Sequence, residues 1–243
     1  MGKDLFSNHA QDYATFRPTY PKELYDFIFS HVEEFELAWD AGTGNGQVAR
    51  DLSKHFRKVL ATDISAKQIE NAFYTENIFY YQVGETTSFP KDSFDLICVA
   101  QAIHWFDRDR FYGEVNRVAK PGAIIVVWGY GLLSVDPEID LLIHDFYVNI
   151  VGPYWDKERN LIDEQYKTIS FPFREIETPE FSFSLLWTLG ELQGYLTTWS
   201  SVQKFMKAKN FNPVEKLIAQ IQPKWKSDKM KINFPFFVRA GYN

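Results

Sequence analysis

The chain has 243 residues, a length typical of roughly one to two domains. With 45% hydrophobic and 24% charged residues, its composition is that of a globular protein and excludes a disordered one. The 26 basic and 32 acidic residues give a net charge of −6 without any basic run, which excludes the electrostatic footprint of a nucleic-acid-binding protein.

The first half of the chain alternates short apolar runs with amphipathic segments. A helix is predicted at 21–34, where Pro21 suits the first turn. Apolar runs without polar alternation predict strands covered on both faces, at 37–40, 59–62, 78–83, 94–100 and 123–128. Strands that alternate with helices at this spacing form parallel βαβ units, so we expect an open, doubly wound α/β sheet.

Several local signals mark the helices between these strands. Apolar stripes predict helices at 48–56 and 111–118. Ser65 and Gln68 form a predicted capping box, which opens a helix that runs through Ala72. Residues 120–122, Lys-Pro-Gly, are expected to end the helix before the fifth strand.

The second half is less regular. We expect a helix at 136–150, a strand at 181–185 and a helix that starts at Asn212. A closing strand is predicted at 232–238, in which Pro235 indicates a bulge or a sheet edge. Residues 151–180 give no clean period. Without a repeat or a linker, the second half is interpreted as insertions on a single domain.

The most informative stretch joins the first predicted strand to its helix. It reads Asp40-Ala-Gly42-Thr-Gly44-Asn-Gly46-Gln47. Glycines there allow a sharp turn and a close approach of the backbone to a ligand. A dinucleotide fingerprint would place its third small residue at Gln47, which is too bulky, and the chain has no Gly-Lys-Ser/Thr P-loop. A short-chain dehydrogenase would also need Tyr-x-x-x-Lys, which is absent.

The acid-x-Gly-x-Gly-x-Gly pattern resembles the first motif of class I methyltransferases that use S-adenosylmethionine, in particular the methyltransferase type 11 domain. The segment 13–21 resembles the N-terminal segment that closes over the cofactor in one branch of these enzymes. The His-Trp pair at 104–105 and residues 194–202 are similar to the trans-aconitate methyltransferase-like branch. The resemblance implies a mostly parallel seven-stranded Rossmann-like sheet with helical insertions after the fifth strand. It divides the single domain 1–243 into a cofactor-covering segment 1–34, a cofactor-binding core 35–130 and a substrate side 131–243.

The cofactor implied is S-adenosylmethionine. Its ammonium suits the carboxylate of Asp40, and Asp63, at the end of the second strand, is expected to accept hydrogen bonds from both ribose hydroxyls. By position Glu85 would bind the adenine amino group, although a solvated acid is an alternative, and Gln68 would pack near the adenine unless it only caps its helix. The candidate cofactor residues are Tyr13, Arg17, Asp40, Gly42, Thr43, Gly44, Gly46, Asp63, Ile64, Gln68, Glu85, Thr86 and Gln101.

His104 is the candidate catalytic residue. It follows the fourth strand, where it could act as a general base or orient a carboxylate that needs no base, and a purely structural histidine is the alternative. The other candidate substrate residues are Tyr20, Trp105, Tyr130 and Trp199. No metal is expected, since the chain has one cysteine and Asp107-Arg-Asp109 reads as a helix start.

The expected function is methyl transfer to a small molecule, most simply to a carboxylate oxygen of a small organic acid. Carbon or hydroxyl methylation of a lipid-like or quinone-like compound is the alternative. A dinucleotide-dependent oxidoreductase using NAD and a non-catalytic nucleoside-binding module are more distant ones. The longest uncharged stretch, 121–135, is shorter than the roughly 20 residues of a membrane span, and the first residues resemble no signal peptide. We therefore expect a cytoplasmic protein without a membrane partner; the oligomeric state is left open.

Overall fold

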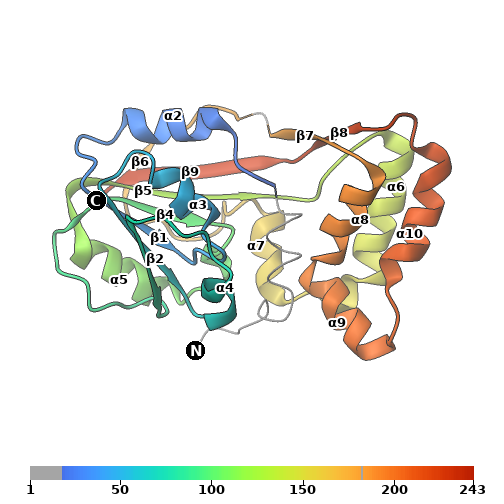
Figure 1. Ribbon diagram of the computed structural model, residues 1–243, viewed down its shortest axis with the longest axis horizontal. Helices are drawn as coiled ribbons and strands as arrows, with labels where there is room; N and C mark the ends of the chain where they lie inside the picture. The colour runs from blue at the N-terminus through green and yellow to red at the C-terminus, as the bar shows by residue number, and fades with distance from the viewer. Residues whose placement is uncertain (1–17, 182) are drawn as a thin grey trace.

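A seven-stranded sheet forms the centre of the molecule (Figure 1). The computed structural model describes residues 18–181 and 183–243. The strand order is β3-β2-β1-β4-β5-β9-β6, in which β9 is antiparallel to both neighbours and the β1 to β5 pairings are parallel. This order confirms the predicted doubly wound, mostly parallel sheet. The strands are β1 Leu37–Ala41, β2 Lys58–Asp63, β3 Ile78–Gln82, β4 Phe94–Ala100, β5 Ala119–Tyr130, β6 Arg174–Ile176 and β9 Phe236–Tyr242.

Helices cover both faces of the sheet, because side chains along each central strand alternate between two cores. Trp39 packs with Phe111 of α5 (Arg108–Val118) on one face. Ala38, its neighbour in β1, packs with Leu24 of α2 (Lys22–Ser30) on the other. Figure 1 shows α2 above the sheet and α5 below it. Two short helices, α3 (Gln47–Leu52) and α4 (Ala66–Glu70), complete the half of the molecule built around strands β1 to β5.

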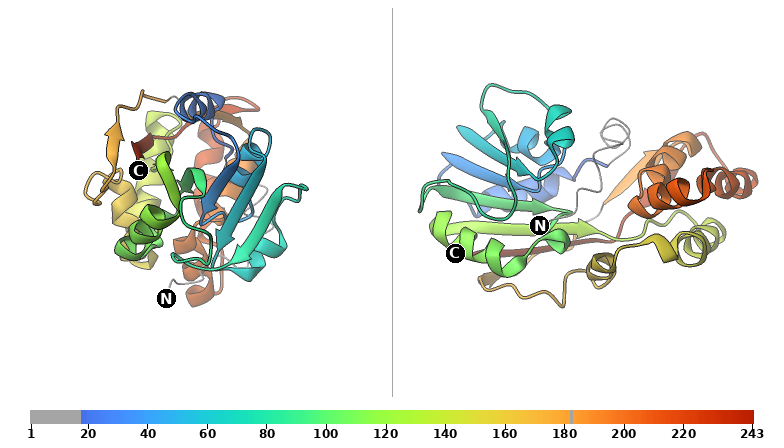
Figure 2. Two further views of the ribbon diagram at one scale, coloured as in Figure 1. Left: turned by 90° about the vertical axis from the view of Figure 1, so that its left-hand side faces the viewer. Right: turned by 90° about the horizontal axis from the view of Figure 1, so that it is seen from below.

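A second group of elements lies beyond one end of the sheet (Figure 2). This helical part is built from helices that share one apolar core of their own, with a two-stranded sheet of β7 and β8. It confirms the prediction of helical insertions after the fifth strand. Its elements are α6 Pro137–Asp145, the π-helical turn Phe146–Ile150, β7 Ser184–Trp187, α8 Leu189–Thr197, α9 Ser200–Lys209, α10 Pro213–Ile221 and β8 Met230–Asn233.

The predicted closing strand at 232–238 is wrong as one element. The chain leaves the small sheet after Asn233, crosses at Pro235 and enters the main sheet as β9. Because proline cannot donate a ladder hydrogen bond, the break falls where the sequence placed a bulge. The Pro235 carbonyl instead accepts a hydrogen bond from Gly131 N at 2.9 Å, which pairs the two crossings between the sheet and the helical part.

Other predicted boundaries need smaller corrections. The first helix ends at Ser30, four residues early, and α4 ends at Glu70 rather than Ala72. Residues 120–122 lie inside β5, so α5 ends at Val118 before the proline. The strand expected at 181–185 is β7, slightly later in the chain. Residues 151–180, which had no predicted structure, contain α7 (Asn160–Asp163) and edge strand β6.

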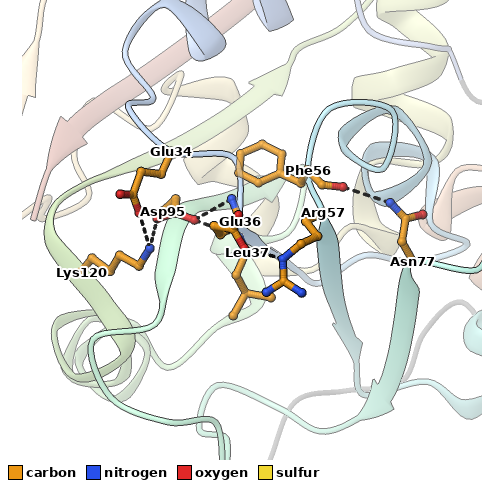
Figure 3. Close-up of polar contacts among 8 residues, drawn as sticks. All are labelled: Glu34, Glu36, Leu37, Phe56, Arg57, Asn77, Asp95 and Lys120. Carbon is orange, nitrogen blue, oxygen red and sulfur yellow. Dashed lines mark hydrogen bonds and ion pairs between the residues drawn. The ribbon is translucent and has the colours of Figure 1, made fainter.

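A buried carboxylate ties the strands together at the end of the sheet where β1 and β4 begin (Figure 3). Asp95 accepts hydrogen bonds from the backbone N–H groups of Glu36 at 3.1 Å and Leu37 at 2.8 Å. Its other oxygen pairs with Lys120 at 2.5 Å, and Lys120 also contacts Glu34 at 2.9 Å. This network stands at the opposite end of β1 from the glycine loop, so it supports the fold and not the site.

Within 18–181 and 183–243, the structure has no helix long and apolar enough to cross a bilayer.

Candidate functional site

A cleft opens beyond the carboxyl ends of the central strands, where strand order reverses between β1 and β4. Ligands bind at this position in open α/β sheets. The cleft has a cavity volume of about 130 Å³. Its walls come from the glycine loop, the ends of β2 and β4 and the turn after β3, with Tyr20, Asp40, Gly42, Thr43, Gly44, Asn45, Gln47, Val48, Thr62, Asp63, Ile64, Gln68, Val83, Gly84, Glu85, Ala100, Gln101, Ala102, Trp105 and Phe106.

The glycine loop needs its glycines for different reasons. Gly44 has φ +55° and its missing side chain would meet nothing within 4 Å, so the backbone there is open to the cleft. Gly46 has φ +81°, and a Cβ would lie 2.1 Å from the hydroxyl of Tyr80. Gly46 does not line the cleft, although it was a candidate cofactor residue. It lets the loop pass over β3 and start α3.

Asp40 is buried at the base of the loop. One carboxylate oxygen, Oδ2, accepts hydrogen bonds from the Thr43 hydroxyl and from Ala49 N, the latter at 2.9 Å. The other, Oδ1, is buried and has no hydrogen-bond partner among the described residues. Burial raises the pKa of Asp40 to about 7, against the lowering effect of the Thr43 and Ala49 hydrogen bonds. A cationic ligand group at Oδ1 would relieve that penalty.

Three more side chains that line the cleft carry buried polar atoms without a partner in the described part of the chain. They are the amide atoms Nδ2 of Asn45, Oε1 of Gln68 and Oε1 of Gln101. Buried polar atoms are nearly always hydrogen-bonded in folded proteins, so this concentration around one cleft indicates a polar ligand. Donors and acceptors are both present, as a nucleoside requires.

Asp63 connects the end of β2 with the glycine loop. Its Oδ2 accepts a hydrogen bond from Gly44 N and its Oδ1 one from Ser65 N, each at 2.8 Å. Ser65 caps α4 by accepting from Gln68 N at 3.3 Å. The predicted capping box is therefore only half formed, because Asp63 takes the N–H that Gln68 would have bonded. The Gln68 side chain is left to line the cleft.

The remaining predicted cofactor residues are divided between the cleft and its surroundings. Ile64 and Glu85 line the cleft, and Glu85 also accepts a hydrogen bond from Asp107 N at 3.2 Å. Thr86 is exposed and does not line it. Tyr20, a predicted substrate residue, lines this cleft and not the second cavity, with its ring 5.4 Å from that of Trp128. The candidates Tyr13 and Arg17 lie outside the described residues.

A second, smaller cavity of about 60 Å³ adjoins the cleft, and Gln101 and Trp105 line both. We call it the acceptor cavity. Most of its wall is aromatic and comes from the helical part and the end of β5, and it brings together four predicted residues: His104, Trp105, Tyr130 and Trp199. The full lining is Gln101, His104, Trp105, Tyr130, Trp155, Arg159, Ile162, Tyr195, Trp199 and Ser200.

Arg159 supplies a positive charge to the acceptor cavity. Its guanidinium lies over the rings of Trp155 and Tyr147, 5.2 and 5.7 Å from their centroids. Nε donates to the Tyr147 hydroxyl at 3.1 Å, and exposed Asp163 lies 3.9 Å from Nη2. Sequence reasoning missed Arg159 because residues 151–180 have no periodicity. The aromatic and charged residues of this segment, such as Tyr154, Trp155 and Arg159, are the sequence feature that could have indicated a site there.

His104 is almost completely buried, with 4% of its surface exposed. Burial, followed by the charges of Arg159 and Arg108, lowers the pKa of His104 to about 3. Its Nδ1 lies 2.8 Å from the hydroxyl of Tyr166, another residue that the sequence did not indicate. The imidazole is therefore neutral at physiological pH and bonded within the protein.

Gln101 forms the seam between the two cavities. Its backbone adopts φ +53°, a left-handed conformation that costs a non-glycine residue about 1–3 kcal/mol. The side-chain Nε2 donates to the Tyr130 carbonyl at 3.0 Å, and the backbone N–H donates to the Trp128 carbonyl at 2.9 Å. These bonds join the end of β4 to β5.

Comparison with known proteins identifies this architecture. Residues 39–127 match the model of a methyltransferase domain family. A Dictyostelium discoideum protein with a provisional methyltransferase name is 34% identical over 97% of this chain and 93% of its own length. The chain belongs to this methyltransferase family. A solved structure from Anaeromyxobacter dehalogenans, provisionally titled a type II methyltransferase, is 33% identical, with a TM-score of 0.84 over 93% of this chain and 98% of that one.

The methyltransferase fold extends to more distant proteins. A Haemonchus contortus phosphoethanolamine N-methyltransferase, solved with S-adenosylhomocysteine, shares 18% identity and the fold, with a TM-score of 0.50 over 98% of this chain and 57% of that one. The chain is an S-adenosylmethionine-dependent methyltransferase. The partnerless oxygen of Asp40 and the partnerless amides around the cleft fit this cofactor, which carries an ammonium and a nucleoside.

Proposed function

We propose that this methyltransferase transfers the methyl group of S-adenosylmethionine to a carboxylate oxygen of a small organic acid. The acceptor would lie in the acceptor cavity, with its reacting group at the seam formed by Gln101 and Trp105. The observation that carries the proposal is the charge of that cavity. Arg159 brings a cation into it, and none of its described lining residues is an aspartate or glutamate. An anionic acceptor is complementary to this lining.

The residues of the cleft would hold the cofactor at its two ends. Asp40 would attract the ammonium, and Asp63 would accept hydrogen bonds from the ribose hydroxyls while it keeps the glycine loop in place. Glu85 and Gln68 are proposed for the adenine. Gly42, Thr43, Gly44, Ile64 and Gln101 would form the remaining contacts, while Gly46 and Thr86 would act only through the shape of the adjoining loops.

The bound cofactor supplies an electrophilic methyl group on a sulfonium. Holding the two reactants in near-attack geometry can supply roughly 7–11 kcal/mol of the barrier. In this chain the aromatic wall of Trp105, Tyr130 and Trp199 would orient the acceptor and exclude water. A carboxylate is ionised at neutral pH, so no residue has to remove a proton before transfer.

A second acceptor class is favoured by the same aromatic lining. Trp155, Tyr195 and Trp199 could pack against a lipid-like or quinone-like compound that is methylated on carbon or on a hydroxyl. Such an acceptor would bring no anion to Arg159 within the cavity, where, among the described residues, the charge of Arg159 would be met only by exposed Asp163, and it would need a base. The carboxylate is therefore the preferred proposal.

Product chemistry distinguishes the two classes. The enzyme would be incubated with methyl-labelled S-adenosylmethionine and a panel of small mono- and dicarboxylic acids, phenols and quinols. Methyl esters release labelled methanol in mild base, whereas methyl ethers and carbon-methylated products do not. We expect base-labile label from acids alone, a KM for the acid at least tenfold higher in Arg159→Gln, and no change in the exposed control Arg110→Gln. Base-stable label from phenols or quinols would overturn the carboxylate proposal.

A further inference from the structure

The hydrogen bond between His104 and Tyr166 determines which ring nitrogen carries the proton. The Tyr166 hydroxyl lies 2.8 Å from Nδ1 of His104, and both side chains are buried. Among the described residues the hydroxyl has no other partner. If Nδ1 carried the proton, the phenolic hydrogen would be buried without an acceptor, a costly arrangement. The phenol therefore donates to Nδ1, and the proton of the neutral ring lies on Nε2.

Tyr166 is held firmly in the position from which it donates. Gln165 and Tyr166 have φ values of +56° and +57°, a strained turn for two non-glycine residues. The Tyr166 carbonyl accepts a hydrogen bond from Arg239 at 3.2 Å. Its ring packs edge-on against Phe237 of β9, with 5.0 Å between centroids. The strained turn thus places the Tyr166 hydroxyl within hydrogen-bond distance of His104.

Burial is the main reason that both groups keep these protonation states. Arg159 precedes α7 and Arg108 begins α5, and both act against protonation of His104. Burial raises the pKa of Tyr166 well above its ordinary value, so the phenol keeps its hydrogen. Arg159 lowers the pKa of Tyr166 and the neighbouring Tyr130, from β5, raises it, but both effects are smaller than that of burial. No described acid lines the cavity.

The free nitrogen of this ring is the one available to a ligand. His104 lines the acceptor cavity, and its Nε2 makes no hydrogen bond to a described residue. A protonated Nε2 has no lone pair with which to remove a proton. It can only donate.

We propose that Tyr166 is a positioning residue that fixes His104 as a neutral Nε2–H donor to the acceptor anion. The inference rests on the proposed function and narrows it: this site methylates groups that arrive already ionised, and does not deprotonate a hydroxyl or a carbon acid. In the step, a carboxylate lone pair forms the new C–O bond while the C–S bond breaks and its electron pair stays on sulfur. No proton moves.

A neutral donor suits this step better than a cation would. The carboxylate loses its negative charge as the ester forms. A positively charged imidazolium bonded to the reacting oxygen would therefore stabilise the ground state more than the transition state. A neutral imidazole N–H can orient the oxygen through a weaker hydrogen bond, while the positive charge of Arg159 attracts the acceptor anion into the cavity.

The protonation state can be measured without any acceptor. In protein labelled with ¹⁵N-histidine, the ring signals that disappear in His104→Gln belong to His104. We expect the Nε2–H tautomer, with no titration between pH 5 and 8, and a change of the Nδ1 shift in Tyr166→Phe. An Nδ1–H tautomer, or titration near pH 6.5, would overturn the inference whatever the enzyme methylates.

Kinetics test the donor role separately. The glutamine amide can donate near the position of Nε2 but cannot act as a base. We expect His104→Gln to keep kcat/KM for the acceptor within about tenfold and His104→Ala to lose about 100-fold, each with unchanged cofactor affinity. Equal losses in the two variants would contradict the donor role, and a loss in His104→Gln that high pH restores would indicate a base.

A matched tyrosine provides the control for Tyr166. The hydroxyl of Tyr112 donates to the Ser170 carbonyl at 2.7 Å, outside the acceptor cavity. Tyr166→Phe should lower kcat/KM about tenfold and shift the His104 signals, whereas Tyr112→Phe should leave both unchanged. Unchanged kinetics and signals in Tyr166→Phe would reduce Tyr166 to a packing residue.

Discussion

The carboxylate of Asp63 accepts a hydrogen bond from the backbone N–H of Gly44 at 2.8 Å, so the residue proposed for the ribose also holds the loop beneath the cofactor. One oxygen serves the loop and the other accepts from Ser65 N, the N-cap of α4. The loop, the cleft and α4 therefore depend on one side chain at the end of β2.

The first prediction concerns this side chain. Asp63→Ala should weaken S-adenosylmethionine binding at least tenfold, about 1.4 kcal/mol, because ribose contacts and loop geometry are lost together. The loss of unfolding free energy should be smaller, since Asp63 is only half-buried. Calorimetric titration and chemical denaturation of the same preparations measure both quantities. Unchanged affinity with a full loss of stability would leave Asp63 a structural residue.

The second prediction is a pH dependence of cofactor binding that arises from Asp40. Its pKa is about 7 in the folded protein, against about 3.9 in an unfolded chain, so the folded state holds this proton between these values. The contribution of Asp40 to the free energy of unfolding is therefore greatest at low pH and falls as the pH rises toward 7. Cofactor binding requires the carboxylate, so affinity should fall up to tenfold per unit below pH 7.

Titration calorimetry in two buffers of different ionisation enthalpy checks this directly. Near pH 6 we expect the release of close to one proton per bound cofactor. Asp40→Asn, which cannot titrate, should bind weakly and show a flat pH profile from this group. A wild-type profile as flat as that of the variant would refute the assignment of the ammonium to Asp40.

The third prediction compares two glycines of the loop. Gly46→Ala combines a left-handed backbone with a Cβ 2.1 Å from the Tyr80 hydroxyl, so it should lower the unfolding free energy by about 3 kcal/mol. Gly44→Ala has similar backbone strain but open space, and should cost about 1 kcal/mol while it reduces cofactor affinity. Urea denaturation and cofactor titration of both variants separate the two effects. Equal stability losses would contradict the steric argument.

The fourth prediction lies far from the site. Asp95→Ala leaves two backbone N–H groups and Lys120 without their shared partner, and should cost about 3 kcal/mol of unfolding free energy. Methyl transfer at a permissive temperature should be unchanged. Arg57→Ala is the matched control, because its pair with Glu36 is exposed and contributes at most about 1 kcal/mol. A specific loss of turnover in Asp95→Ala would show that the strand ends are coupled to the cleft.

The half of the molecule built around strands β1 to β5 was predictable because its signals are local. The strands of the parallel sheet are continuous apolar runs, and the motif around Gly42 specifies a backbone shape within a few residues. The same holds for Asp107, which caps α5 as expected by accepting from Arg110 N at 3.3 Å. The single-domain division of the chain stays a prediction.

The acceptor side was harder because it is assembled from distant, aperiodic pieces. Arg159 and Tyr166 lie in short turns whose positions depend on packing against Trp155 and Phe237, and no spacing in the chain records this. His104, the predicted catalytic residue, lines the second cavity, and its role stays a prediction. Its neutral state could not be seen from sequence, since that state follows from burial and from arginines up to 55 residues away.

At Gln101 the backbone conformation lowers local stability, whereas the side chain is needed for the geometry of the site. Glycine at this position would relax the left-handed backbone at once, and a design guided by stability alone would choose it. The same change would delete the amide that donates to the Tyr130 carbonyl and lines both cavities. The wall shared by the cleft and the proposed acceptor cavity thus includes a residue whose own backbone conformation is unfavourable.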